Sequence, residues 1–513
     1  KSLTALAILG LLPTSAHTEG TIYFNDNNLL TASEKQYQNL RSRSIAMIFQ
    51  EPMTSLNPTM SCGYQVSEVL KQHTELSSKQ IRKEVLTLFK KVKLPRIEDM
   101  FSAYPHQISG GQKQRVMIAM ALACKPELLI ADEPTTALDV TVQKEIIALL
   151  KDLQKDTGMS ILFITHDLAL VSEIADDIVV MYRGTIIEKG AVDRVFLHPE
   201  KNYTKALINS KPSLKQRLKK LPTVTDFIEN TINQDVYTKK ARELFHQKIY
   251  AKPPLLEVKN LEKTFISEKG WFTTKKIVKA VDGVSFKLYE GETLGLVGES
   301  GCGKTTLGRT ILHLEKATAG QVFYKGIDIL ALDKKAIKAL RKDIQIIFQD
   351  PFSSLNPRIS IGDAIMEPMT VHGILTSRKE RKAYVISLLK KVGLLPEHFS
   401  RYPHEFSGGQ RQRIGIARTI ALQPRLIICD ESVSALDVSV QAQVLNLLND
   451  LKSEFEFSYI FISHDLSVVK YMSDQLVVMN KGRIEEINDA DTIYEKPTSA
   501  YTQKLIDSIP KGL

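Results

Sequence analysis

The chain carries one long internal duplication, and this repeat limits the possible folds more than any other feature of the sequence. QISGGQKQRVMIAMAL at 107–122 resembles EFSGGQRQRIGIARTI at 405–420, which lies 298 residues further on. The same offset pairs Asp132 with Asp430. Solenoid repeats have periods of about 20 to 50 residues, so a repeat of this length indicates two tandem globular domains.

The repeat places a first domain at 1–211 and a second domain at 255–513. The residues between them, 212–254, have no counterpart after the second copy and are rich in lysine and arginine. We expect these residues to form a solvated basic linker. Contact of the linker with anionic lipid is the alternative that its charge allows.

The beginning of the chain aligns with the middle of a motif in the second copy. Lys1 and Ser2 match Lys304 and Thr305, and the apolar residues after Ser2 match those after Thr305. We therefore expect this apolar segment to be a helix of the first domain and not a signal peptide. On this alignment the sequence is an N-terminally truncated fragment, whose first domain lacks most of its phosphate-binding loop.

The composition is that of a globular protein and excludes several other classes. Hydrophobic residues make up 43% of the 513 residues and charged residues 25%, unlike a disordered or collagen-like chain. The four cysteines lie far apart, so neither a disulfide framework nor a zinc site is expected. No stretch of about 18 apolar residues is present, which argues against a membrane-spanning helix. The net charge of +10 suits anionic partners, but over this length it is more typical of a solvated surface.

A glycine-rich motif in the second copy predicts nucleotide binding. GESGCGKT at 298–305 fits the pattern G-x-x-x-x-G-K-[ST] and follows an apolar, strand-like run at 294–297. Glycines let backbone N–H groups surround phosphate oxygens at a helix N-terminus, the lysine reaches the β- and γ-phosphates, and the hydroxyl binds Mg²⁺. The residues predicted to bind ATP in this way are Gly298, Glu299, Ser300, Gly301, Cys302, Gly303, Lys304, Thr305 and Thr306, with Lys1 and Ser2 in the first copy.

Two interpretations of Cys302 are open. A thiol near a helix N-terminus can become acidic and reactive. The alternative is a small side chain that only has to fit inside the loop.

Each copy ends one apolar, strand-like run with two acidic residues, Asp132–Glu133 and Asp430–Glu431. At such a position an aspartate can hold Mg²⁺, and a glutamate can accept a proton from the attacking water. A histidine then follows the next strand-like run at the same distance in both copies, which indicates a contact to the γ-phosphate. The predicted catalytic residues are Glu133, Glu431, His166 and His464, and the predicted Mg²⁺ ligands are Ser2, Thr305, Asp132 and Asp430.

An SGGQ segment precedes each of these acidic pairs, and the motifs together resemble the ATP-binding cassette (ABC) family over nearly the whole chain outside the linker. The resemblance implies an α/β fold of two tandem P-loop NTPase domains, each a RecA-like mixed sheet with a helical subdomain. It also implies that Gln50 and Gln349 act in catalysis and bind Mg²⁺. In this family the signature of one cassette closes over ATP held by the other, so an intramolecular cassette dimer is expected. The further nucleotide contacts that the resemblance implies are Ser109, Gly110, Gly111, Gln112, Ser407, Gly408, Gly409, Gln410, Asp139, Asp437 and Phe265.

The role of Phe265 depends on its surroundings. The family places an aromatic ring under adenine upstream of the glycine-rich loop, and Phe265 matches by position. A phenylalanine in the core of a strand is the alternative interpretation.

The two copies also end alike, in YTKALINSKP at 203–212 and YTQKLIDSIP at 501–510. EPMTSLNP at 51–58 and DPFSSLNP at 351–358 form a second matching pair. These features resemble the peptide-import branch of bacterial ABC ATPases, in the tandem form of the microcin C, oligopeptide and glutathione importers.

The resemblance implies a motor subunit at the cytoplasmic face of the bacterial inner membrane. Such a subunit hydrolyses ATP and drives two separate permease subunits, which an extracytoplasmic solute-binding protein supplies. Helices expected in 60–105 and 360–400 are the permease-docking segments of the family. No nucleic-acid partner is implied, and the cysteines that hold an iron–sulfur cluster beside the tail in some relatives are absent. The competing function is a soluble tandem ABC ATPase that acts on ribosomes or DNA, which the basic charge favours and the tails disfavour.

Overall fold

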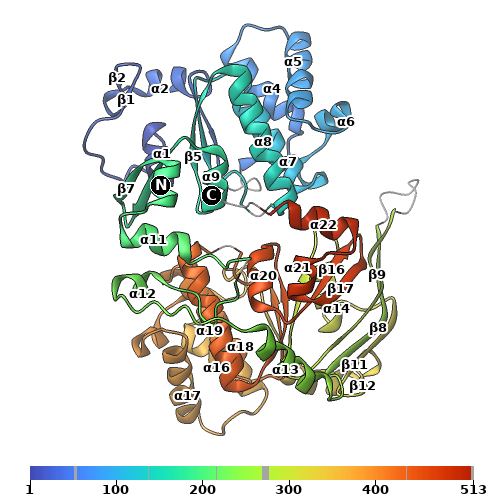
Figure 1. Cartoon of the computed structure of the whole chain (residues 1–513). Coiled ribbons are helices and arrows are strands. Elements are labelled where there is room, and N and C mark those ends of the chain that lie inside the picture. Colours follow the sequence, from blue (N-terminus) through green and yellow to red (C-terminus); the bar gives the residue numbers. More distant parts are fainter. Residues whose placement is uncertain (51–54, 137, 215, 268–275, 435, 510–513) are drawn as a thin grey trace. The chain divides into compact units, whose positions relative to one another are not determined.

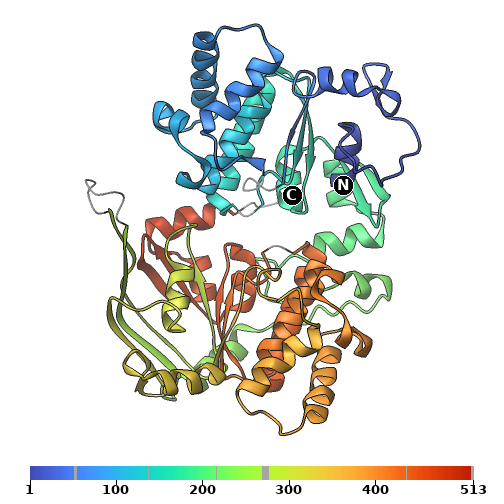
Figure 2. The same ribbon diagram turned by 180° about the vertical axis from the view of Figure 1, so that it is seen from behind.

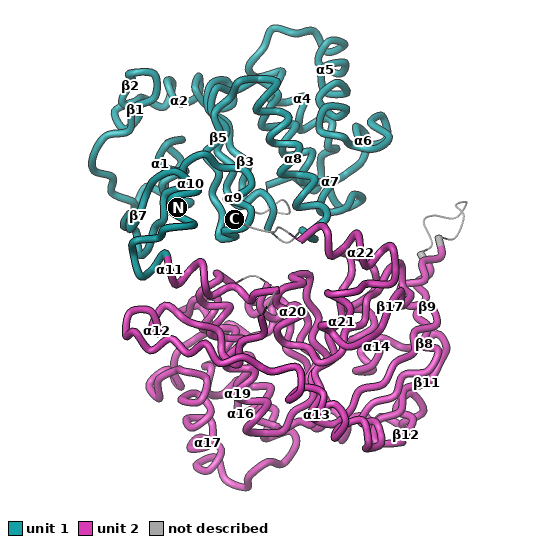
Figure 3. The backbone as a smooth tube through the Cα atoms, viewed as in Figure 1, with its two compact units in different colours: residues 1–204, 510–513 teal, residues 205–509 magenta. Residues whose placement is uncertain are grey.

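The computed structural model describes the chain from residue 1 to residue 509 except residues 51–54, 137, 215, 268–275 and 435. It contains two compact units, residues 1–204 and residues 205–509, which we describe separately (Figure 3). Among the described residues, none of the helices combines the length and the apolar character needed to cross a bilayer.

Unit 1 has a parallel sheet in the order β3-β4-β5, with β3 at Ile45–Ile48, β4 at Leu128–Asp132 and β5 at Ser160–Ile164. Two antiparallel hairpins accompany it, β1–β2 and β6–β7. The remaining elements are α1 (Ser2–Ile8), β1 (Tyr23–Phe24), β2 (Asn27–Asn28), η1 (Leu29–Thr31), α2 (Glu34–Leu40), α4 (Cys62–His73), α5 (Ser78–Lys91), α6 (Ile97–Ser102), η2 (Pro105–Gln107), α7 (Gly110–Ala121), α8 (Val140–Thr157), α9 (Leu168–Ile174), β6 (Asp177–Tyr182), β7 (Thr185–Ala191) and α10 (Val192–Leu197), with α11 (Asn202–Asn209) at the boundary.

Unit 2 repeats this plan with a larger sheet in the order β13-β14-β15-β10-β16-β17 and a second sheet in the order β12-β11-β8-β9. Its strands are β8 (Leu256–Ser267), β9 (Lys276–Leu288), β10 (Thr293–Val297), β11 (Ala319–Tyr324), β12 (Ile327–Asp328), β13 (Ile344–Ile347), β14 (Leu426–Asp430), β15 (Ser458–Ile462), β16 (Gln475–Asn480) and β17 (Arg483–Asp489). Its helices are α12 (Val224–Ile228), α13 (Lys239–Tyr250), α14 (Lys304–Ile311), η3 (Ile329–Ala331), α15 (Lys334–Asp343), α16 (Ile361–Val371), α17 (Arg378–Lys391), η4 (Pro396–Ser400), η5 (Pro403–Glu405), α18 (Gly408–Ile420), α19 (Val438–Phe455), α20 (Leu466–Met472), α21 (Ala490–Glu495) and α22 (Ala500–Asp507). This mixed α/β architecture confirms the fold class expected from the sequence.

A helical subdomain is present in both units, where the sequence predicts helices. In unit 1 it consists of α4, α5 and α6, which lie together away from the β3–β5 sheet (Figures 1 and 2). In α5 the apolar residues recur at helical spacing, and Ile81, Val85, Leu88 and Phe89 are all buried. Ser77 and Gln80 form a capping box at the start of this helix, which satisfies backbone N–H groups that the first turn leaves without partners. In unit 2, α16, α17 and η4 form the corresponding group.

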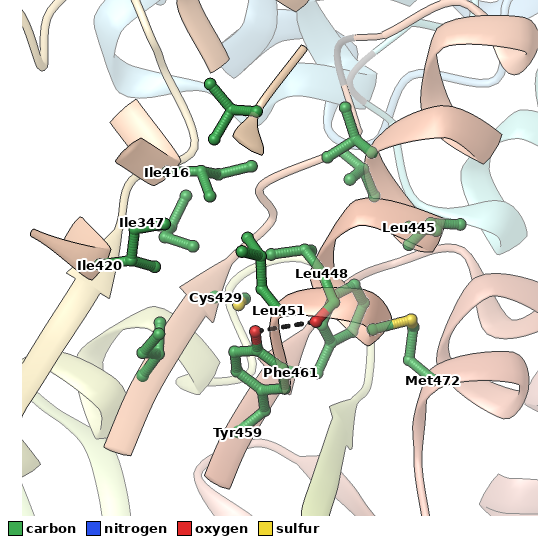
Figure 4. Packing of buried hydrophobic residues seen from close by; sticks show 14 of the residues in the cluster. Ile347, Ile416, Ile420, Cys429, Leu445, Leu448, Leu451, Tyr459, Phe461 and Met472 are labelled. Atoms are coloured by element: carbon green, nitrogen blue, oxygen red, sulfur yellow. Dashed lines mark hydrogen bonds between the residues drawn. The ribbon is translucent and has the colours of Figure 1, made fainter. Parts of the chain in front are cut away.

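The central strands of unit 2 are buried on both faces, as expected for parallel strands covered by helices. Every residue of β10, β14 and β15 is buried. On one side of the sheet, Tyr459 and Phe461 pack near Cys429 and against α19, and the Tyr459 hydroxyl donates to the carbonyl of Leu448 at 3.1 Å (Figure 4). This apolar core fixes the strand ends that carry the candidate site.

The two units differ in the burial of the strands that flank β10 in unit 2 and of their counterparts in unit 1. There, β10 lies between β15 and β16, and their residues Ile460 and Val477 are 1% and 0% exposed. The corresponding residues of unit 1, Leu162 on β5 and Val179 on β6, are 39% and 53% exposed. Among the described residues of unit 1, β5 and β6 belong to separate sheets. Side chains at these two matched positions are therefore buried where a strand lies between them, as β10 does in unit 2.

The basic segment 212–254 differs from the solvated linker that its composition suggests, because its described residues pack onto unit 2. Leu221 is buried in the core of unit 2, and its backbone N–H and C=O both bond the side chain of Asn446 on α19, at 2.9 and 2.8 Å. Ile249 on α13 is buried as well. Apolar anchors spaced along a charged sequence thus hold the segment, which composition alone does not reveal.

Charged side chains of this segment form ion pairs with half-buried aspartates of unit 2. The Arg217 guanidinium donates to the carbonyl of Ser473 at 2.6 Å and lies 3.2 Å from Asp491. Arg242 on α13 bonds Asp489 at 3.1 Å and also pairs with Asp491. Together these contacts attach the segment to the end of α20 and the end of β17.

One acidic side chain beneath α13 gives a pH-dependent prediction. Glu292 is fully buried and accepts hydrogen bonds from the Tyr250 hydroxyl and the Tyr289 N–H, both at 2.8 Å. Burial raises the pKa of Glu292 to about 7 in spite of these bonds. The unfolded chain ionises this group near pH 4.5, so the group lowers the free energy of unfolding as pH rises from about 4.5 to 7.

We therefore expect Glu292→Gln, which keeps the shape without the charge, to gain stability relative to the parent chain as pH rises. The gain should be near zero at pH 4 and approach about 2 to 3 kcal/mol at pH 8. The urea dependence of hydrogen exchange in β10 and α13, measured for both proteins at several pH values, reports this gain separately from the unfolding of unit 1. A difference that stays constant between pH 4 and pH 8 would contradict the raised pKa.

Candidate functional site

The glycine-rich loop of unit 2 connects β10 to α14, and its glycines are required by close backbone approaches. Gly298 has φ 148° and Gly303 has φ 108°, and a Cβ atom at these positions would lie 2.1 Å from the Met479 carbonyl and 2.0 Å from the Ala280 carbonyl. Any other residue at either position would therefore collide with backbone. The loop is wrapped tightly against β16 and β9, with the N-terminus of α14 at its end.

The ammonium of Lys304 lies at the centre of this loop. Its Nζ donates to the carbonyls of Gly298 and Glu299 at 2.7 and 3.0 Å, and the side chain is 5% exposed. The loop thus presents a fixed positive charge together with the N–H groups at the start of α14, which is the chemistry that recognises phosphate.

Cys302 lies within this loop, and its thiol is not acidic. The residue is buried, with Sγ 3.7 Å from Lys304 Nζ. Burial raises the pKa of the Cys302 thiol more than the lysine beside it lowers it. The structure contradicts the interpretation of Cys302 as an activated thiol, because the desolvation of the thiolate outweighs the helix N-terminus and the ammonium. A small side chain that fits the loop is the interpretation that remains.

A hydroxyl and a carboxylate meet beside the loop and suit a divalent cation. Thr305 Oγ1 donates to Asp430 Oδ1 at 3.0 Å. Burial raises the pKa of Asp430, and the neighbouring Glu431 adds to the effect. In unit 1 burial raises the pKa of Asp132 as well, and its buried Oδ1 has no hydrogen-bond partner among the described residues. Buried oxygen ligands whose negative charge is not compensated fit Mg²⁺.

The second acidic residue of each pair forms the same three-residue cluster in both units. In unit 2, Gln349 Nε2 donates to Glu431 Oε2 at 2.9 Å, and His464 Nδ1 lies 3.3 Å from the same oxygen. In unit 1 the corresponding distances are 2.9 Å from Gln50 to Glu133 and 3.2 Å from His166 to Glu133. The three residue types that the sequence places far apart are thus brought together twice.

The charge state of this cluster follows from its geometry. Burial acts to raise the pKa of Glu431, but the hydrogen bond and charge of His464 outweigh it and hold the pKa below its usual range. Burial likewise acts to lower the pKa of His464, and Glu431 outweighs it so that the pKa is raised. The glutamate is therefore ionised and able to accept a proton, with the imidazole beside it.

Both glutamates have a backbone conformation that the sequence does not reveal. The φ angles are 49° at Glu133 and 48° at Glu431, in the left-handed region that residues with a Cβ atom rarely adopt. Each N–H still donates to the adjacent strand, to the carbonyl of Ile164 or Ile462. This sharp turn directs the carboxylate away from the strand and toward the glutamine and histidine. Strain of this kind costs of the order of 1–3 kcal/mol and is typical of functional sites.

The SGGQ segments form the N-termini of α7 and α18. Ser109 and Gln112 form a capping box, in which each side chain bonds the backbone N–H of the other, and Ser407 and Gln410 do the same. Gly111 and Gly409 lie close to the next helix. A Cβ atom added at these positions would be 2.8 Å and 2.5 Å from a valine methyl group, which leaves little room for a side chain. The segments thus place a glycine-rich helix N-terminus at the protein surface.

Four further predicted contacts have different surroundings. Asp139 caps α8 by accepting the N–H of Val142 at 2.9 Å, whereas Asp437 begins α19 without such a bond. Phe265 on β8 is 40% exposed, with Lys263 Nζ 4.7 Å from its ring centre, so it is not a core phenylalanine. In unit 1, Lys1 Nζ donates to the carbonyl of Thr165 at 3.0 Å. The segment 51–54, part of the predicted post-glutamine motif, lies outside the described residues.

Strand order, glycine-rich loop, acidic strand end and capped signature helix together define an ATPase of the P-loop class. The chain belongs to the ABC transporter family, whose profile matches residues 1–136 and 281–434. A second profile, the C-terminal region of oligopeptide/dipeptide transporters, matches residues 187–233 and 486–512. The chain is thus a tandem ABC ATPase with an oligopeptide-type tail after each cassette, as the sequence predicted.

The chain is similar to curated proteins over almost its entire length. It is 46% identical over 518 aligned positions to the glutathione import ATP-binding protein GsiA of Escherichia coli O157:H7, covering 99% of this chain and 82% of that protein. The GsiA protein of Escherichia coli K12 gives the same identity and coverage. Among solved structures, a dimeric bacterial ABC transporter cassette is 28% identical with a TM-score of 0.42, covering 46% of this chain and 98% of that one.

Proposed function

We propose that the chain is the ATP-hydrolysing subunit of a bacterial importer for peptides or peptide-like compounds. The observation that carries this proposal is the oligopeptide/dipeptide tail, which matches after both cassettes. Similar proteins of the same tandem form are named for glutathione import, and glutathione is itself a peptide. A soluble tandem ATPase acting on ribosomes or DNA has no use for such tails.

The residues of unit 2 have complementary roles in hydrolysis under this proposal. Lys304 and the N–H groups at the start of α14 bind the phosphates, and Thr305 with Asp430 holds Mg²⁺. When bound, Mg²⁺ neutralises negative charge on the β- and γ-phosphates. Glu431 accepts a proton from the attacking water, while Gln349 and His464 fix the position of its carboxylate. Phe265 stacks on adenine under this proposal, and its exposure favours this role.

The partners follow from the same assignment. We propose two integral-membrane permeases, supplied by an extracytoplasmic solute-binding protein, with this chain peripheral to the cytoplasmic face of the inner membrane. The helical subdomains, α4–α6 and α16–η4, are the docking surfaces that the family resemblance implies. The composite sites, in which Ser109–Gln112 and Ser407–Gln410 each complete the site of the other cassette, stay a prediction of that resemblance.

Purification from native membranes tests the proposal. We expect two multi-span permeases to co-purify with the chain from detergent-solubilised bacterial membranes and to be identified by mass spectrometry. Uptake of labelled glutathione and dipeptides by cells that contain only the Glu431→Gln form should then fall to background. Recovery of ribosomal or DNA-repair proteins without permeases would overturn the transport assignment and leave the ATPase assignment intact.

A further inference from the structure

The C-terminal tail of unit 2 contacts the glycine-rich loop directly. Tyr501, in the first turn of α22, accepts a hydrogen bond on its hydroxyl from the backbone N–H of Glu299 at 3.1 Å. Glu299 is the second residue of the loop, and the two residues lie more than 200 positions apart in the sequence. The tyrosine belongs to the YTQKLIDSIP tail at 501–510, and no role in nucleotide binding follows from that motif.

The Tyr501 hydroxyl and the Lys304 ammonium hold the same peptide group. The N–H of Glu299 and the C=O of Gly298 belong to one planar peptide unit. Its N–H donates to Tyr501 at 3.1 Å, and its C=O accepts from Lys304 Nζ at 2.7 Å. A hydrogen bond at one end of a peptide group strengthens the bond at its other end, because each polarises the group in the same direction. The tail hydroxyl thus acts on the lysine through a single peptide.

The tyrosine itself is held by buried contacts of the tail. Glu486 on β17 is 8% exposed, and its carboxylate accepts the N–H groups of Thr498 and Ser499 at 3.0 and 3.1 Å. Ser499 Oγ then accepts the N–H of Tyr501 at 3.3 Å. Leu505, one turn further along α22, is buried in the same core cluster as Val297, the residue before the loop. The residues before Tyr501 and the residues after it are therefore both held in place by contacts with the rest of unit 2.

Unit 1 repeats the anchor around a corresponding tyrosine. Glu188 accepts the N–H groups of Glu200 and Lys201 at 2.9 and 3.3 Å, as Glu486 does in unit 2. The corresponding tyrosine, Tyr203, has its ring 4.3 Å from the ring of Tyr182. A matched tyrosine with the same anchor is thus available as a control within the chain.

We propose that Tyr501 is a positioning residue for ATP binding: it fixes the Gly298–Glu299 peptide, and through it the place of Lys304, in the loop of unit 2. The oligopeptide-type tail is then part of the nucleotide site and not only a feature of the transporter branch. This inference rests on the proposed role of the loop as the ATP site. The hydroxyl bonds a backbone N–H of the loop, so we expect its effect on affinity and not on the chemical step.

Tyr501→Phe tests this inference, with Tyr203→Phe as its matched control. Loss of one hydrogen bond to a backbone N–H should raise the Kd and KM for Mg-ATP about 5- to 10-fold, with kcat changed less than 2-fold. Hydrogen exchange measured by mass spectrometry should be about 10-fold faster in the peptide that contains Glu299. Tyr203→Phe, which removes the same hydroxyl from unit 1, should leave hydrogen exchange in the peptide that contains Glu299 unchanged.

Two outcomes would overturn the inference. Kd and KM within 2-fold of the parent chain would show that the hydroxyl does not act on the site. Equal losses in kcat and affinity, together with a lower thermal midpoint without nucleotide, would assign the hydroxyl a purely structural role. Lys304→Ala separates this failure from failure of the proposed ATP site: if Lys304→Ala binds ATP as well as the parent chain, the site assignment itself is wrong.

Discussion

Glu431→Gln should lower the rate of ATP hydrolysis by about 10²- to 10⁴-fold while ATP binding is retained. The carboxylate is held ionised by its neighbours and can accept a proton from water, and a positioned general base typically contributes a factor of this size. Glutamine keeps the shape of the side chain and can still accept the hydrogen bond that Gln349 donates at 2.9 Å. The loop with Lys304 is unchanged, so affinity should stay within 2- to 3-fold.

Phosphate release and equilibrium binding of a fluorescent ATP analogue, measured on the same preparation, check this prediction. Glu397→Gln is a suitable control, because Glu397 is exposed in the helical subdomain and outside the cluster. Glu133→Gln measured in parallel shows whether the first cassette turns over as well. With the first cassette inactivated by Glu133→Gln in both proteins, hydrolysis in Glu431→Gln within 10-fold of the protein that keeps Glu431 would mean that another group accepts the proton.

The parts of the site that depend on short, contiguous motifs could be predicted from the sequence. Gly298–Thr305 is a contiguous motif in which the three glycines all have positive φ angles, which favour glycine, and Lys304 returns to carbonyls of its own loop. The acidic strand ends were also predictable, since buried β4 and β14 carry uninterrupted apolar runs that stop at Asp132 and Asp430.

The parts that depend on contacts between distant segments could not be predicted. The left-handed turn at Glu133 and Glu431 has no sequence signal, because glutamate is not a residue that favours this conformation. The bond from Glu299 to Tyr501 depends on where β17 places the tail. Composition also gave the wrong expectation of a solvated linker for 212–254, because the buried anchors Leu221 and Ile249 are few among many charged residues.

Arg217→Met should destabilise unit 2 by about 3 kcal/mol. The Arg217 side chain is 10% exposed, and its guanidinium bonds the carbonyls of Tyr471 and Ser473 at the C-terminal end of α20. It also pairs with Asp491 at 3.2 Å. Removal of one partner from a buried pair typically costs 3–5 kcal/mol, because the other charge remains desolvated. Asp491 keeps Arg242 and Lys470 as neighbours, which places the expected loss at the lower end.

Lys219→Met is the matched control, since it removes a positive charge two residues away on the same segment. Lys219 is 53% exposed and lies 3.8 Å from Asp235, which is 63% exposed. Exposed pairs typically contribute 0.2–1 kcal/mol. Urea dependence of hydrogen exchange in α13 and α20 reports on unit 2 separately from unit 1, which a single unfolding curve of a two-unit chain does not.

Comparing Arg217→Met with Lys219→Met shows whether charge alone or buried geometry holds the basic segment on unit 2. If charge alone attracted it to unit 2, both substitutions would weaken its attachment similarly, and high salt would weaken both further, because exposed pairs are screened. If the buried geometry holds it, Arg217→Met loses several times more stability than Lys219→Met, and the loss changes little with salt. Adding Asp491→Asn to Arg217→Met should then recover part of the loss, since the half-buried side chain that has lost one of its partners no longer carries a charge. Additive losses in this double variant would contradict a direct pair between Arg217 and Asp491.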